Sequence, residues 1–109
     1  MAEQPDGLVV LTVVLRRSEG TKTDWWQCSA HQSGSRTTFW ERGFHVRGGK
    51  MTELFNRTTD EIWDAAMADA WLLSQVRGKL VGGFTLVQEQ SEVPDGPLAD
   101  LLSNPKVVK

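Results

Sequence analysis

The chain has 109 residues, 39% of them hydrophobic and 24% charged, and its formal net charge at pH 7 is −2. This length suits one domain with one core, and it leaves little room for a catalytic cleft between lobes. The net negative charge excludes a protein that binds nucleic acid over its whole surface, and the single cysteine excludes an intramolecular disulfide.

The first half of the chain has the pattern of an antiparallel sheet. A polar lead-in over residues 1–7 precedes an apolar run rich in β-branched residues, which predicts a strand covered on both faces. This run is too short to span a membrane, and the acidic lead-in is unlike a signal peptide, so we expect a cytoplasmic protein. Four strands are expected, at residues 8–15, 24–31, 37–47 and 50–55.

Turn residues and side-chain alternation set the expected geometry of these strands. Gly48 and Gly49 permit a tight turn between the third and fourth strands. Trp25 and Trp26 are adjacent in the second strand and therefore point to opposite faces. We expect one of them in the core and the other on the surface.

Residues 58–77 carry the pattern of one long helix. Thr58 and Glu61 match a capping box, with Thr58 as the N-cap, and Gly78 is a suitable helix terminator. On a helical wheel, one arc of about 180° is apolar, and we expect it to pack on the sheet. This arc contains Ile62, Trp63, Ala66, Met67, Ala70, Trp71, Leu73 and Ser74.

The sequence after the helix predicts a last strand over residues 84–89 and a linker-like tail over residues 91–109. Within this tail, residues 98–103 have the composition of a short helix. We expect it to fold back onto its own domain, and the alternative is that it docks in the groove of a partner. The pattern as a whole predicts an α+β fold, with a four- or five-stranded antiparallel sheet packed against one long helix. The expected domain spans residues 8–90, and a short C-terminal tail follows it.

No motif points to catalysis, a cofactor or a metal. Cys28 and His31 lie three apart in a strand and point to opposite faces, and only His45 remains as a further soft ligand. The chain has no nucleophile elbow, and its glycine pairs match turns rather than phosphate-binding loops. We therefore expect a protein that is not an enzyme and that has no metal site.

Basic and aromatic residues gather in one part of the chain. Residues 16–50 hold seven Lys or Arg against three acids, a balance of +4, together with three of the five tryptophans, whereas residues 51–109 have a balance of −4. Aromatic rings stack on bases and cations neutralise phosphates, so this segment predicts nucleic-acid binding. The residues expected to bind are Trp25, Trp26, Arg36, Trp40, Arg42, Arg47 and Lys50.

The order of these elements resembles the WGR domain, a small module of some poly(ADP-ribose) polymerases and bacterial proteins. Trp40-Glu41-Arg42 stands where the family has Trp-Gly-Arg, Gly48-Gly49-Lys50 follows, and the segment 79–87 is similar to the family's ending. The resemblance covers residues 8–88. It implies a sheet crossed by one helix and a nucleic-acid-binding surface on which Trp40 stacks and Arg42 meets phosphate. Glu41 replaces the family's glycine, and an acid there would oppose phosphate binding.

Two functions therefore remain open. The first is a non-enzymatic module that binds DNA or RNA. The second is a protein-interaction module or a self-associating dimer, whose interface would contain the apolar strand 8–15 and the surface tryptophan.

Overall fold

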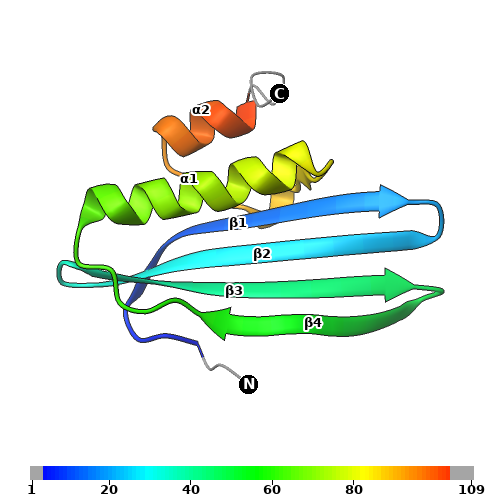
Figure 1. Cartoon of the computed structure of the whole chain (residues 1–109), viewed down its shortest axis with the longest axis horizontal. Coiled ribbons are helices and arrows are strands. Elements are labelled where there is room, and N and C mark those ends of the chain that lie inside the picture. Colours follow the sequence, from blue (N-terminus) through cyan, green and yellow to red (C-terminus); the bar gives the residue numbers. More distant parts are fainter. Residues whose placement is uncertain (1–3, 104–109) are drawn as a thin grey trace.

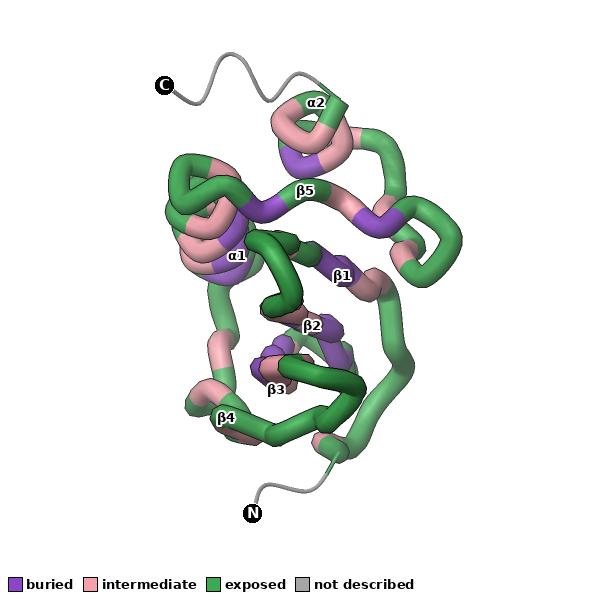
Figure 2. Tube along the Cα trace, turned by 90° about the vertical axis from the view of Figure 1, so that its right-hand side faces the viewer, coloured by how far each residue is buried: buried purple, intermediate pink, exposed green. Residues whose placement is uncertain are grey.

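The computed structural model describes residues 4–103, and it has an α+β fold in which a five-stranded antiparallel sheet carries one long helix (Figure 1). The strands are β1 (Leu8–Glu19), β2 (Lys22–Ser33), β3 (Arg36–Arg47), β4 (Lys50–Thr58) and β5 (Thr85–Leu86). The helices are α1 (Ala65–Val81), the short 3-10 helix η1 (Gln88–Gln90) and α2 (Pro97–Ser103). The order across the sheet is β4-β3-β2-β1-β5, and α1 lies on one face of it (Figure 2).

Three tight hairpins build most of the sheet. Neighbouring strands pair in consecutive order, and two residues connect each pair from β1 to β4. Gly48 and Gly49 form the predicted turn, with φ angles of 59° and 79°. Positive φ at both turn positions matches the twist of the flanking strands and favours glycine.

The core lies between the sheet and α1. From the sheet it includes Val13, Leu15, Trp26, Cys28, Ala30 and Phe39, and from α1 it includes Ala68, Leu72 and Val76. Trp26, Cys28 and Ala30 share one face of β2 because side chains alternate along a strand, as the sequence predicts. Burial of these apolar groups is the main source of stability for such a sheet and helix.

Helix α1 begins later than the capping-box pattern predicts. Thr58 is the last residue of β4 and pairs with Trp40, so the chain is still extended at that position. The N-cap is Asp64, whose Oδ1 accepts hydrogen bonds from the backbone N–H groups of Ala66 and Met67 at 2.8 and 3.2 Å. The prediction of Thr58 as N-cap was wrong because strand pairing continues through it.

The buried face of α1 also differs from the predicted arc. Its buried residues are Ala68, Leu72 and Val76, whereas Met67 is 65% exposed. Trp63 precedes the N-cap and is 64% exposed, so its prediction as a core residue was wrong. Trp71, at the border of the buried face, stacks on Phe39 with ring centroids 4.6 Å apart.

The chain after α1 packs back onto the domain. The helix continues past Gly78 and ends at the C-cap Gly82, and the predicted strand over residues 84–89 is reduced to β5 and η1. Helix α2 confirms the predicted short helix, and its Leu98 is buried against the core. The remainder of the predicted tail, residues 104–109, lies outside the described residues. Within residues 4–103, no helix is long and apolar enough to cross a membrane.

Candidate nucleic-acid interface

The sheet has a second face, opposite α1, that we call the open face. Trp26 points towards α1, so its neighbour Trp25 points to the open face. Strand pairing sets Arg16 of β1, Trp25 of β2 and Phe44 of β3 directly opposite one another in one row. The alternation along β2 and β3 adds Gln27, Trp40 and Arg42 to this face.

Arginine side chains lie over the aromatic rings of the open face. The guanidinium carbon of Arg16 is 5.4 Å from the ring centroid of Trp25. That of Arg42 is 5.2 Å from the ring of Trp40 and 4.7 Å from the ring of Phe44. These distances are in the range of cation–π contacts, so three rings and two cations form one layer across β1, β2 and β3.

A shallow depression of about 280 Å³ opens on this face beside Trp25 and Phe44. It is lined by Val14, Trp25, Gln27, Phe44, Met51 and Gln90. The aromatic and aliphatic walls offer stacking surface, and the two glutamine amides offer donors and acceptors. This combination can receive a flat ring that carries polar groups at its edge.

Trp40 and Arg42 are held in place by neighbours. The indole N–H of Trp40 donates to Oδ1 of Asn56 at 2.7 Å, and Arg42 forms an ion pair with Glu53 at 3.1 Å. The ring of His31 meets Trp40 edge to face, with centroids 6.2 Å apart. Trp40 is therefore a fixed part of the layer, with less free ring surface than a side chain without these contacts.

His31 lies beside Trp40, on the same side of β2 as Trp25, and is almost completely buried, at 1% exposure. Its Nε2 is 2.8 Å from Oγ of Ser29, and its Nδ1 has no hydrogen-bond partner in the described part of the chain. Burial lowers the pKa of the imidazole, because the charged form loses its hydration. His31 is thus a neutral packing residue at pH 7 rather than a cation of the site.

Five of the predicted binding residues lie towards the open face or at one end of the sheet. Trp25, Trp40 and Arg42 are in the layer. Arg47 and Lys50 are exposed and pair with each other across the Gly48–Gly49 turn. Lys22, opposite Arg47 on β2, adds a further cation to this end of the sheet, and Glu19 is its neighbour on β1.

The prediction of Trp26 as a binding residue was wrong. Trp26 is 1% exposed, and its indole N–H donates to Oε2 of Glu41 at 2.8 Å on the α1 side of the sheet. The expectation that one residue of the Trp25/Trp26 pair joins the core is confirmed. Strand alternation requires opposite faces, but only the position of α1 decides which tryptophan is inside.

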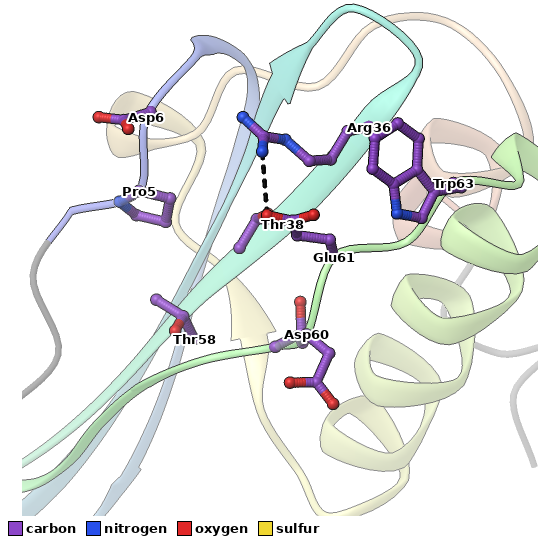
Figure 3. A pocket seen from close by; sticks show the side chains of 9 residues that line it. Pro5, Asp6, Arg36, Thr38, Thr58, Asp60, Glu61 and Trp63 are labelled. Atoms are coloured by element: carbon purple, nitrogen blue, oxygen red, sulfur yellow. Dashed lines mark hydrogen bonds and ion pairs between the residues drawn. The ribbon is translucent and has the colours of Figure 1, made fainter.

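Arg36 lies apart from the other predicted residues, at the start of β3 (Figure 3). It forms an ion pair with Glu61 at 2.9 Å, beside an open polar depression of about 630 Å³. Asp6, Asp60 and Trp63 also line this depression. Because three acids surround Arg36, this end of the molecule is unfavourable for phosphate.

Glu41 does not lie beside Trp40 and Arg42 on the open face. It is 4% exposed on the α1 side, where its second carboxylate oxygen accepts from Nε of Arg57 at 2.7 Å. Contrary to what the sequence led us to expect, Glu41 therefore does not stand beside a phosphate bound at the layer. Here the middle residue of the Trp-x-Arg motif has a structural role, which is to satisfy the buried indole of Trp26.

The predicted set omitted Arg16, Phe44 and Met51. Phe44 alternates in phase with Trp40 along β3, so the period of the strand was a sufficient signal for it. Arg16 lies one residue beyond the predicted end of the first strand, and Met51 comes to the site only through the pairing of β4 with β3. Predicting Arg16 and Met51 as site residues would require knowing which residues pair across the strands.

Among residues 4–103, no three His, Cys, Asp or Glu side chains are close enough to hold a metal ion. The thiol of Cys28 is fully buried, and burial raises its pKa, so it is a packing group rather than a nucleophile. No family model, no curated protein and no solved structure matches the chain. The resemblance to the WGR domain stays a prediction.

Proposed function

We propose that the protein is a non-enzymatic module that binds single-stranded nucleic acid on the open face of its sheet. The observation that carries the proposal is the layer in which Arg16 and Arg42 lie over Trp25, Trp40 and Phe44. Sheet faces with this composition bind single strands, because exposed bases stack on the rings and cations meet the phosphates. In a duplex the bases are stacked on each other, and a broad sheet face does not fit the grooves.

The contacts suggest separate roles within the face. Trp25 and Phe44 border the depression and are the residues for stacking on a base. Arg16 is exposed beside Trp25 and is suited to a phosphate. The exposed cations Arg47 and Lys50 lie at the tip of the β3–β4 hairpin, where alternation along β3 directs them to the side opposite Phe44. They attract phosphate to this end of the sheet without being part of the open face.

We also propose a relationship to the WGR domain, as the source of this surface. The proposal is supported by the positions of Trp40 and Arg42, which share the open face as stacking and cationic residues. In this chain, however, the indole of Trp40 is engaged by Asn56 and His31, so Trp25 has the larger role in stacking.

The test is a titration of labelled single-stranded DNA, single-stranded RNA and a duplex of the same sequence, at low and moderate salt. We expect the single strands to bind more tightly than the duplex. We also expect the affinity to fall by roughly tenfold or more between about 50 and 200 mM salt, because several cations release counterions. Absence of binding to every ligand at about 50 mM salt would contradict the proposal, since electrostatic attraction is strongest there.

A second candidate function is protein interaction through the first half of β1. Leu8, Val9 and Val10 are 74%, 43% and 36% exposed, and they precede the part of this edge that is already paired, by Glu92 at Thr12 and by β5 at Leu15 and Arg16. An apolar edge of this kind can accept a strand from a partner or from a second copy. A Val9→Lys substitution should abolish association through this edge in sedimentation experiments, and unchanged association would exclude it.

A further inference from the structure

The outward face of α1 is apolar although it faces solvent. We use this name for the side of the helix turned away from the sheet (Figure 2). Its residues Ala66, Met67, Ala70, Ser74, Gly78 and Val81 are all exposed, Met67 and Val81 at 65% and 66%. Arg77 lies on the same side of the helix and is its one charged residue. A helix on the surface of a monomer normally carries charged residues on this side, so the face has the composition of a contact surface.

We infer that the outward face of α1 is a homodimer interface, in which α1 packs antiparallel against α1 of a second copy. The inference is independent of nucleic-acid binding. It explains why Met67 and Val81 are exposed on a side of α1 that carries one charge. The buried residues of α1 pack in the core, and the outward face contacts the second copy.

The charges at the two ends of α1 favour a second copy in antiparallel orientation. The exposed acids are Asp64, which is the N-cap, and Asp60, which lies shortly before it, whereas Arg77 lies in the last turns of the helix. An antiparallel pair sets the acidic end of each helix against the basic end of the other, and the twofold axis repeats this contact. A parallel pair would set like charges together, so it is disfavoured.

The spacing of the outward face allows close packing. Ala66, Ala70, Ser74 and Gly78 follow one another at intervals of four residues and form one ridge of small side chains. With a twofold axis between Ala70 and Ser74, Ala70 of each copy meets Ser74 of the other. Arg77 then lies within reach of Asp64 of the second copy, one oxygen of which is free of the N-cap hydrogen bonds.

The α1–α1 dimer would fix where the two open faces lie. Because α1 covers one face of the sheet and the open face is the other, the dimer has its two open faces on opposite outer sides. Under the proposed function, the dimer would present two separate single-strand sites, and a ligand long enough to reach both would gain avidity.

The first test is sedimentation velocity over a wide range of protein concentrations, since a contact between two helices of this length forms a small, concentration-dependent interface. We expect the wild type to shift from monomer to dimer and Ala70→Glu to stay monomeric. The matched control is Ala65→Glu, an exposed position of the same helix outside the outward face, which should dimerise as the wild type does. Arg77→Glu should weaken the dimer at least about tenfold.

Site-specific cross-linking gives the second test. Cys28 is fully buried, so a thiol introduced by Ala70→Cys is the only accessible one, and it should cross-link two copies. The Ala65→Cys control should not. A wild type that stays monomeric at all concentrations, or a dimer that persists in folded Ala70→Glu, would overturn the inference. Ala70→Glu should bind a short oligonucleotide as the wild type does, so a failure of nucleic-acid binding is separable from a failure of dimerisation.

Discussion

Replacement of Glu41 by alanine should lower the free energy of unfolding by about 3 kcal/mol. The indole N–H of Trp26 is buried and donates to the Glu41 carboxylate at 2.8 Å, so the substitution leaves a buried donor unsatisfied. That loss costs about 1–3 kcal/mol, and removal of the buried Cγ methylene of Glu41 adds about 1 kcal/mol. Arg57 is 63% exposed in its side chain, so its lost ion pair contributes about 0–1 kcal/mol.

Urea and thermal unfolding, followed by tryptophan fluorescence and circular dichroism, measure this effect. For a domain of this size, the expected decrease in melting temperature is roughly 12 °C. Glu41→Gln is the matched control: its amide oxygen still accepts from Trp26, so it should cost only about 1 kcal/mol. If the alanine and glutamine variants are equally stable, the buried hydrogen bond between Trp26 and Glu41 does not contribute to the stability of the fold, which would contradict this prediction.

Three further predictions concern the fold. Gly43→Ala should cost about 1–3 kcal/mol in urea unfolding, because a Cβ there would overlap the ring of Phe55; wild-type stability would contradict this. The unfolded chain protonates His31 near pH 6.5, whereas burial lowers its pKa in the folded state, so stability should be full above about pH 6.5 and decline as the pH falls. Melting temperatures of His31→Asn should decline less as the pH falls, and a decline identical to that of the wild type would show that His31 is not the cause. Asp64→Ala should lower the free energy of unfolding by about 1 kcal/mol through loss of the N-cap. A larger loss in Thr58→Ala would favour Thr58 as the N-cap, as the sequence predicts.

The sheet was largely predictable because its signals are local. Side-chain alternation in β2 correctly groups Trp26 with Cys28, and the Gly48–Gly49 pair correctly locates a hairpin. The strand ends were less accurate: β1 continues through Glu19, where the sequence has polar residues. Pairing with β2 holds these residues in the sheet, and hydrogen bonds to a neighbouring strand leave no mark in the local pattern.

The helix shows the limit of such patterns. Both Thr58 and Asp64 are suitable N-caps, and the choice depends on the pairing of Thr58 with Trp40 in the sheet. The helical wheel correctly identifies apolar side chains on α1, but these side chains lie on two sides of the helix. Contact with the sheet selects Ala68, Leu72 and Val76, and a helical wheel contains no information about where the sheet lies.

The candidate site was predictable in part for the same reason. Trp25, Trp40 and Arg42 follow from position within a strand, although Trp26 could be separated from Trp25 only by the location of α1. Arg36 belongs to the basic segment of the sequence but folds to the opposite end of the sheet, beside Glu61. A basic segment of the sequence therefore does not have to form a basic surface in the folded protein.

The most direct test of nucleic-acid binding on the open face compares two single tryptophan substitutions. Trp25→Ala removes a ring of the layer, whereas Trp63→Ala removes an exposed indole that lies before α1, outside the layer. Affinity for a labelled single strand of about 12 nucleotides should fall about 5- to 150-fold with Trp25→Ala, the usual value of one stacked base, and should not change with Trp63→Ala. Equal losses in the two variants, or no loss in Trp25→Ala, would contradict the account.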